Sequence, residues 1–308
     1  MNQQSVVDSI CKITNKENVL VNENMRNHTT FKVGGPADIF VKPKDKKEAA
    51  EIVRLLLENK IPYYVIGNGS NLLVSDKGYR GCIICMSEGM DFIEIDDNII
   101  TAGAGAILSK VCNMAMESSL SGLVFASGIP GSVGGAIYMN AGAYGGEMKD
   151  VVKEVELLNS ATGEIKIVPG ADMGFAYRTS IVKNSPYIVL SAKFELMSAD
   201  REEIKSQMNE LSAKRREKQP LEYPSAGSTF KRPEGYFAGK LIEDANLKGY
   251  RVGGACVSQK HSGFVVNDNN ATCEDIITLI RDVRRIVNEK FGVLLEPEVC
   301  MLGEGISL

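Results

Sequence analysis

The sequence contains only two histidines, His28 and His261, among 308 residues. A metal site built from several histidines is therefore excluded, and a Ser-His-Asp triad is disfavoured. The seven cysteines are odd in number and scattered, which argues against a disulfide framework. Because Cys82 and Cys85 lie in an apolar stretch, we interpret this C-x-x-C as two buried thiols of a strand rather than half a zinc site or a redox pair.

Long apolar runs and an excess of positive charge are also missing. No stretch approaches the roughly 18 to 20 apolar residues that a membrane helix needs. Residues 1–20 lack the apolar core of a signal peptide. The net charge is −4 with 24% charged residues, a balance that does not attract polyanions. We therefore expect a cytoplasmic protein without nucleic-acid or membrane partners.

What is present is a regular alternation of helical and strand-like patterns. With 44% hydrophobic residues, the chain is long enough for two or three domains. Apolar residues at helical spacing predict helices over 46–59, 107–120, 199–218 and 273–291, and strands are predicted over 63–66, 72–74, 155–158, 164–168 and 188–196. Capping boxes are expected at Asp45 with Glu48 and at Thr272 with Asp275. The patterns predict an α+β protein in about three parts.

A first glycine-containing turn, Gly67-Asn-Gly-Ser-Asn71, follows a predicted strand. Glycines permit positive φ, and successive N–H groups in such a turn can bind an anion. The turn is not a Rossmann fingerprint, because Leu72 stands where the third glycine would be. A phosphate-binding loop and a purely structural turn both remain open for this segment.

A second glycine-rich segment is more unusual, because its glycines are interleaved with apolar residues. It reads Gly128-Ile-Pro-Gly-Ser-Val-Gly-Gly-Ala136 and resumes at Asn140-Ala-Gly-Ala-Tyr-Gly-Gly146. We predict a long loop packed against a large, partly apolar ligand with a charged middle, a shape that FAD has. Ser132, Asn140 and Tyr144 are its candidate polar contacts.

Six motifs then occur in one order along the chain. They are Asn27-His-Thr-Thr-Phe-Lys-Val-Gly-Gly-Pro36, Gly67-Asn-Gly-Ser-Asn-Leu-Leu73, Gly128–Gly135 with Asn140-Ala-Gly-Ala-Tyr144, Tyr177-Arg178, Ala226-Gly-Ser-Thr-Phe-Lys231 and Leu295-Glu-Pro-Glu-Val299. Together they resemble the UDP-N-acetylenolpyruvoylglucosamine reductases, the MurB family of peptidoglycan synthesis. The region 177–197, which has no inserted tyrosine-bearing loop, resembles the shorter, second type of that family.

The resemblance implies a two-subdomain FAD-binding fold of the PCMH/vanillyl-alcohol-oxidase type plus a C-terminal α+β substrate-binding domain. The implied boundaries are 1–85 and 86–215 for the FAD-binding subdomains and 216–308 for the substrate domain. It further implies FAD as cofactor, NADPH as co-substrate, no metal and a monomer. The implied FAD contacts are Gly67, Asn68, Gly69, Ser70, Asn71, Gly128, Ile129, Pro130, Gly131, Ser132, Gly134, Asn140, Ala141, Gly142 and Tyr144.

By the same resemblance, Arg178, Ser228 and Glu298 carry the chemistry. Hydride addition to an enolpyruvyl methylene carbon pushes charge onto the carboxylate, and that charge must be stabilised where it develops. Arg178 offers a planar fork of donors, and a protonated Glu298 could donate to the same group. Ser228, after a turn at Gly227, could protonate the adjacent carbon as a general acid.

The resemblance also implies residues that contact the UDP-sugar. They are Tyr177, Lys218 and Lys231. The basic residues beside Lys218 equally fit a solvated helix end, so that alternative stays open. Arg232 departs from the pattern of one branch and receives no role. The family pattern selects Glu298, after Pro297, rather than Glu296.

The function expected is NADPH-dependent reduction of UDP-N-acetylglucosamine enolpyruvate to UDP-N-acetylmuramate through FAD. The alternative is another flavin oxidoreductase of the same superfamily, acting on a small alcohol or sugar. Many such oxidases attach their flavin through a histidine or cysteine. Neither His28 nor His261 lies in the glycine-rich segment, which favours the reductase.

Overall fold

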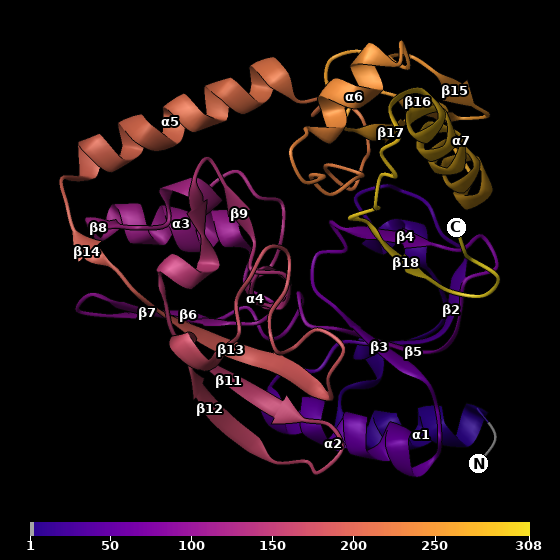
Figure 1. Cartoon of the computed structure of the whole chain (residues 1–308). Coiled ribbons are helices and arrows are strands. Elements are labelled where there is room, and N and C mark those ends of the chain that lie inside the picture. Colours follow the sequence, from indigo (N-terminus) through magenta and orange to yellow (C-terminus); the bar gives the residue numbers. More distant parts are fainter. Residues whose placement is uncertain (1–2) are drawn as a thin grey trace. The chain divides into compact units, whose positions relative to one another are not determined.

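The structure is a computed structural model that describes residues 3–308. It divides into two compact units. Unit 1 comprises Met1–Val21, Ile39–Asn68 and Gly81–Ala213, and unit 2 comprises Asn22–Asp38, Gly69–Arg80 and Lys214–Leu308. Both units mix helices and strands (Figure 1), which confirms the predicted α+β class.

Unit 1 is built on a five-stranded antiparallel sheet with the strand order β12-β11-β13-β7-β6. Its strands are β6 (Ile93–Asp96), β7 (Ile99–Gly103), β11 (Val152–Asn159), β12 (Ile165–Pro169) and β13 (Tyr187–Glu195). On β13, Leu190, Ala192 and Phe194 are at most 1% exposed. Since alternate side chains of a strand share a face, this face forms part of the core. The short helix α4 (Val133–Tyr138) packs against β13 and β7.

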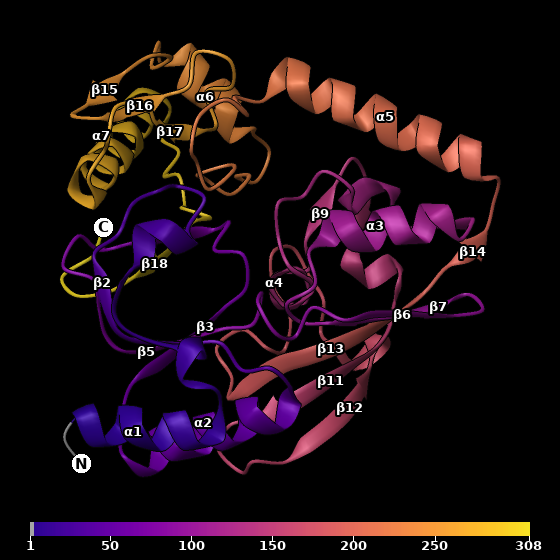
Figure 2. The ribbon, with the colours of Figure 1, turned by 180° about the vertical axis from the view of Figure 1, so that it is seen from behind.

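Three longer helices complete the frame of unit 1. They are α1 (Gln3–Ile13), α2 (Lys46–Glu58) and α3 (Leu108–Glu117), and α1 and α2 lie side by side in both views (Figures 1 and 2). The Asp45 carboxylate accepts from the N–H groups of Lys47 and Glu48 at 2.8 and 2.9 Å, which confirms it as the N-cap of α2. The Glu48 carboxylate accepts from the N–H of Lys44 at 2.9 Å. The capping box predicted for Asp45 with Glu48 was therefore wrong in its second half.

Shorter elements connect these parts. In unit 1 they are η1 (Lys16–Asn18), β3 (Tyr63–Ile66), β8 (Leu120–Ser121), η3 (Val124–Ala126), β9 (Gly142–Ala143), β10 (Gly146–Glu147), η4 (Met148–Asp150), η5 (Gly170–Asp172) and β14 (Met197–Ser198). Four elements contain a junction between the units: β1 (Val19–Asn24), β2 (Pro36–Val41), β5 (Tyr79–Cys85) and α5 (Arg201–Lys218). Strands β1, β2, β5 and β3 form a four-stranded sheet in that order.

Unit 2 packs α7 (Cys273–Phe291) on a three-stranded antiparallel sheet, β15-β16-β17. The sheet strands are β15 (Arg251–Val252), β16 (Ala255–Val257) and β17 (Val265–Asn267), and the other elements of the unit are η2 (Met25–His28), β4 (Leu72–Val74), α6 (Ala238–Asp244) and β18 (Cys300–Leu302). The predicted apolar stripe of α7 is confirmed, because Ile276, Leu279, Ile280, Val283 and Val287 are all fully buried.

The ends of α7 follow from its local sequence. Thr272 Oγ1 accepts from the N–H of Asp275 at 3.1 Å, and the Asp275 carboxylate accepts from the N–H of Thr272 at 3.0 Å, so the predicted capping box is confirmed. Asp76, distant in sequence, adds a second cap by accepting from the N–H groups of Cys273 and Glu274. Gly292 ends the helix in the left-handed region, with φ of 69°.

We predicted a long loop for the second glycine-rich segment, and this was wrong. The segment contains α4 and the β9–β10 hairpin. The reason is close packing. A Cβ added to Gly134 would lie 3.1 Å from Ala104, so glycine lets this turn of helix lie directly on the neighbouring chain. Gly146 is needed likewise, since its Cβ would lie 2.7 Å from the Phe125 ring. The glycines therefore serve packing as well as ligand approach.

All seven cysteines are free thiols. Cys82 and Cys85 lie in β5 and are buried, and burial raises the pKa of both thiols, which disfavours the reactive thiolate. Our interpretation of this pair as buried thiols of a strand is confirmed. Within residues 3–308, the helices lack the combination of length and apolarity that a membrane span requires.

Candidate active site

The two predicted glycine loops meet in unit 1. Gly67 and Asn68 follow β3 directly, and Asn68 Nδ2 donates to the carbonyl of Pro130 at 2.6 Å. A Cβ added to Gly67 would lie 1.9 Å from Ser132 Oγ, so the approach of the two segments requires glycine here. Two motifs found separately in the sequence therefore build one surface.

Ser132 has the chemistry of a ligand contact. Its side chain is 1% exposed, and its Oγ has no hydrogen-bond partner among residues 3–308. Buried hydroxyls are almost always paired, so an orphan hydroxyl beside two closely packed loops marks a place for a polar group of a ligand. A phosphate or ribose oxygen of FAD satisfies that requirement, and the residues present therefore fit the cofactor.

A substitution at Gly67 tests this surface. We expect Gly67→Ala to reduce the FAD content of the purified protein severely, because the added methyl group and Ser132 Oγ cannot both occupy their places. The measurement is the molar ratio of flavin, released by heating, to protein. Gly163→Asn is the matched control, since Gly163 lies at positive φ in an exposed turn with open space around it. Equal flavin content in Gly67→Ala and the parent would contradict the assignment.

Residues 103–106 are buried and pack against the Ser132 segment, a contact that the sequence analysis did not predict. The carbonyls of Ala104 and Ala106 accept from the N–H groups of Gly134 and Val133, each at 2.8 Å. A Cβ added to Gly105 would lie 1.8 Å from the carbonyl of Met86. The available signal was the alternation of alanine and glycine at 102–106, which permits such close approach.

The remaining predicted FAD contacts divide between the units. Gly128, Ile129, Gly131, Gly134, Asn140, Ala141, Gly142 and Tyr144 lie in unit 1, and Gly69, Ser70 and Asn71 lie in unit 2. Tyr144 and Gly145 form the tip of the β9–β10 hairpin with φ of 53° and 91°. Positive φ at both positions is what a two-residue type I′ turn requires. The Tyr144 ring is 49% exposed and therefore open to a ligand.

Tyr177 and Arg178 lie at the tip of a second two-residue turn in unit 1. Ala176 and Thr179 exchange both main-chain hydrogen bonds at 3.2 Å. Arg178 has a φ of 55°, which is unfavourable for a bulky residue. The Arg178 guanidinium lies 5.2 Å from the Tyr177 ring centroid. The turn thus presents an aromatic ring and a cation together.

Unit 2 joins the first glycine turn to the Leu295–Val299 motif. Asn71 Nδ2 donates to the carbonyl of Glu298 at 3.2 Å, and the Asn71 carbonyl accepts from the N–H of Cys300 at 2.9 Å. Beyond them, β4 and β18 pair in parallel. Gly69 has φ of 59° and approaches the His28 carbonyl so closely that a Cβ would lie 1.9 Å from that oxygen. The turn therefore has a structural role within unit 2.

Main-chain hydrogen bonds place Ser228 and Glu298 on neighbouring segments. Thr229 follows Ser228, and its carbonyl accepts from the N–H of Glu298 at 2.8 Å. Phe230 and Pro297 form an antiparallel bridge beside it. Gly227 turns the chain at a φ of 76°, which presents Ser228 at the surface. Two of the three predicted catalytic residues are therefore close together, whereas Arg178 belongs to unit 1.

The structure distinguishes the two glutamates beside Pro297. Lys231 Nζ lies 2.9 Å from the Glu296 carboxylate, and its hydrogen bond and charge lower the pKa of Glu296. Glu296 is therefore held as a carboxylate and cannot donate a hydrogen bond. Glu298 is half-buried, and its main chain is fixed by Thr229 and Asn71. The two glutamates therefore differ in that Lys231 engages the Glu296 carboxylate, whereas the main chain of Glu298 is held beside the Ser228 segment.

The predicted substrate lysines are both in unit 2. Lys218 is exposed and is the last residue of α5. Lys231 would have to exchange Glu296 for a ligand, which costs little because exposed ion pairs contribute little to stability.

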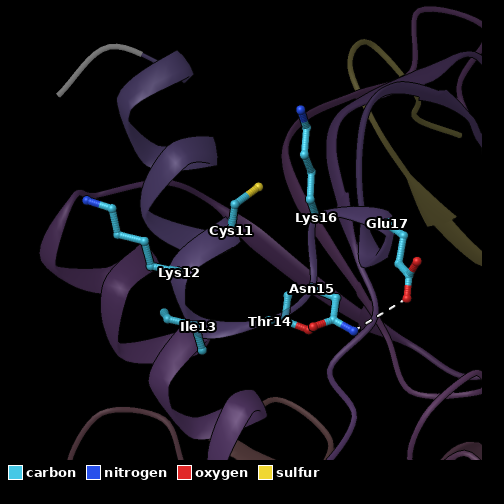
Figure 3. A pocket seen from close by; sticks show the side chains of 7 residues that line it. All are labelled: Cys11, Lys12, Ile13, Thr14, Asn15, Lys16 and Glu17. Carbon is cyan, nitrogen blue, oxygen red and sulfur yellow. Dashed lines mark hydrogen bonds between the residues drawn. The ribbon is translucent and has the colours of Figure 1, made fainter.

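A hollow of about 450 Å³ at the end of α1 is not part of this site (Figure 3). Cys11 to Glu17 line it, and Asn15 Nδ2 donates to the Glu17 carboxylate at 3.4 Å. It contains none of the predicted site residues. Within residues 3–308, no group of three or more His, Cys, Asp or Glu side chains is arranged to hold a metal ion.

Family models and solved structures match this chain. The model of an FAD binding domain matches residues 37–168, and that of the C-terminal domain of UDP-N-acetylenolpyruvoylglucosamine reductase matches residues 219–302. The crystal structure of this reductase (MurB) from Thermus caldophilus is 34% identical, with a TM-score of 0.79 over 92% of this chain and 98% of that one. Alkyldihydroxyacetonephosphate synthase, 14% identical with a TM-score of 0.50 over 63% of this chain and 40% of its own, shares the fold alone.

Curated relatives match over nearly the whole chain. The UDP-N-acetylenolpyruvoylglucosamine reductase of Agathobacter rectalis is 54% identical over 98% of this chain and 99% of its own length. That of Caldanaerobacter subterraneus subsp. tengcongensis is 51% identical over 97% and 98%. Both predictions drawn from the six motifs, the family and the FAD-binding fold, are confirmed. This chain belongs to the UDP-N-acetylenolpyruvoylglucosamine reductase family.

Proposed function

We propose that this chain reduces UDP-N-acetylglucosamine enolpyruvate to UDP-N-acetylmuramate with NADPH, using FAD. The observation that carries the proposal is the pairing of the Ser228 and Glu298 segments in the domain that matches the reductase C-terminal model. The full-length relatives support the reductase over the alternative oxidase. His28, which contacts Glu23 at 2.9 Å, and His261, which accepts from the N–H of Gly263, both lie outside the two glycine-rich segments.

The cofactor would be held by the two glycine loops. Ser132 Oγ, Asn68 and the main chain of residues 128–142 offer the polar contacts, and Tyr144 offers an exposed ring. When bound, FAD supplies the two-electron carrier that links NADPH to the substrate double bond.

The protein's own residues supply charge and a proton. The reaction breaks the carbon–carbon π bond and forms two C–H bonds, one from a hydride that originates in NADPH and one from a proton. The Arg178 fork and protonated Glu298 stabilise the charge that develops on the substrate carboxylate. Ser228 donates its hydroxyl proton to the carbon beside that carboxylate and is then reprotonated from solvent. Tyr177, Lys218 and Lys231 contact the UDP-sugar, with Lys218 at the diphosphate.

The finer features are part of the same proposal. Residues 1–85 and 86–215 form the FAD-binding subdomains and residues 216–308 the substrate domain, in a monomeric cytoplasmic enzyme without nucleic-acid or membrane partners. The segment Thr179–Pro186 leads from the Tyr177 turn directly to β13, which supports the shorter, second type of the family.

A direct spectrophotometric assay tests the function. Purified holoenzyme is mixed with NADPH and the enolpyruvyl UDP-sugar, and the absorbance of reduced nicotinamide is followed. We expect one NADPH to be oxidised for each UDP-N-acetylmuramate formed, with negligible oxidation when the sugar is omitted. The absence of NADPH oxidation on addition of the sugar, or a flavin that stays on the protein after acid precipitation, would favour the oxidase.

A further inference from the structure

The turn that carries Tyr177 and Arg178 is fastened by a buried amide. Asn140 is 1% exposed, and its Nδ2 donates to the carbonyl of Ala176 at 3.2 Å and to the Glu147 carboxylate at 2.9 Å. Its Oδ1 accepts from the N–H of Lys149 at 3.0 Å. An asparagine amide has two N–H donors and one carbonyl, so these three bonds engage both donors and the acceptor. The Asn140 side chain, which we expected to contact FAD, therefore forms its hydrogen bonds within the protein.

Glu147, at the end of β10, holds the Asn140 amide through its carboxylate. The oxygen that accepts from Asn140 also lies 2.9 Å from Lys149 Nζ. The hydrogen bond from Lys149, then that from Asn140 and the positive charges of Lys149 and Arg178 lower the pKa of Glu147. Its carboxylate is therefore ionised at neutral pH, and it holds the same Asn140 amide that binds Ala176 in the Arg178 turn.

We propose that Asn140 and Glu147 are positioning residues for Arg178: Asn140 fixes the main chain of the turn, and the charged Glu147 carboxylate fixes the Asn140 amide. The inference rests on the proposed role of Arg178. An arginine side chain has considerable rotamer entropy, and a charge-stabilising group is effective only when it is held in place before the reaction. At Arg178 the turn also holds a φ of 55°, so this main chain needs support from its neighbours.

The first measurement is the effect of Glu147→Gln, which keeps the size of the side chain and removes its charge. We expect kcat for substrate reduction to fall about tenfold, as for directly coupled residues. The rate of flavin reduction by NADPH in the absence of the sugar should stay within about twofold, because Arg178 acts on the sugar carboxylate. Glu147→Asp, which keeps the charge, should recover part of the loss. An unchanged kcat in Glu147→Gln overturns the proposal.

The decisive measurement is a double-mutant cycle. If Glu147 acts through Arg178, Glu147→Gln should cost less than about twofold in an Arg178→Ala background, although it costs about tenfold in the parent. The same loss in both backgrounds would identify Glu147 as a merely structural residue. If Arg178→Ala alone keeps the parent's rate, the proposed role of Arg178 fails and the positioning role fails with it. If Arg178→Ala is slow and Glu147→Gln costs the same in both backgrounds, the role of Arg178 stands and only the positioning role of Glu147 is overturned.

Lys149→Met is the matched control for the ion pair. Lys149 forms an ion pair with the Glu147 carboxylate, and its side chain is 49% exposed. Since exposed ion pairs contribute little, we expect a change in kcat below about twofold. A loss equal to that of Glu147→Gln would assign the effect to the Lys149 pair and overturn the link to Arg178.

Discussion

Ser228→Ala is expected to slow substrate reduction by about 10²- to 10⁴-fold, the usual contribution of a positioned proton donor. The reduction of the flavin by NADPH should be nearly unchanged, because that step requires no proton on the substrate carbon. The two half-reactions can be followed separately by rapid mixing, first with NADPH alone and then by adding the enolpyruvyl UDP-sugar to the reduced enzyme. Reoxidation by the sugar is the step that should slow.

The neighbourhood of Ser228 allows a sharp control. Ser225→Ala lies three residues earlier in the same segment, and we expect both half-reactions of this variant to stay within about twofold of the parent. Equal slowing of both half-reactions in Ser228→Ala would indicate damage to the flavin site rather than loss of a proton donor. Unchanged reoxidation by the sugar would remove Ser228 from the chemistry altogether.

Arg178→Ala is expected to lower kcat for substrate reduction by about 10²- to 10³-fold, the range measured when one charge-stabilising donor is removed. Arg178→Lys should recover only part of this loss, because an ammonium group lacks the planar fork that matches a carboxylate. The measurement is again reoxidation of the reduced enzyme by the sugar. A fully active Arg178→Lys would show that charge alone, without the fork, is sufficient.

The main chain offers a second readout for the same residue. At a φ of 55°, glycine is favoured over arginine, so Arg178→Gly should unfold at a temperature no lower than the parent while losing activity. A variant that is as stable as the parent but inactive would show that Arg178 is needed for activity and not for stability. Early unfolding of Arg178→Gly would mean that the arginine side chain holds unit 1 together, and its slow reaction would then be a secondary effect.

The tertiary structure gives neighbouring residues different surroundings that their spacing does not show. Glu296 and Glu298 flank Pro297, and the resemblance alone selects Glu298, whereas the fold shows that Glu296 pairs with Lys231, which lowers the pKa of Glu296. Asn140 is a similar case. In the sequence it is one polar residue among glycines and was assigned to FAD, but in the fold its amide is engaged by Ala176, Glu147 and Lys149.

Features that depend on local interactions were determined by the sequence alone. The limits of α7, with Thr272 and Asp275 at its start and Gly292 at its end, follow from residues within one turn of each other, and the motifs identify the family. The junction of Gly67 with Ser132 and the pairing of Thr229 with Glu298 join residues tens of positions apart. Only the tertiary structure decides such contacts, because they depend on which strands pair and how closely main chains approach, and neither is encoded in local spacing.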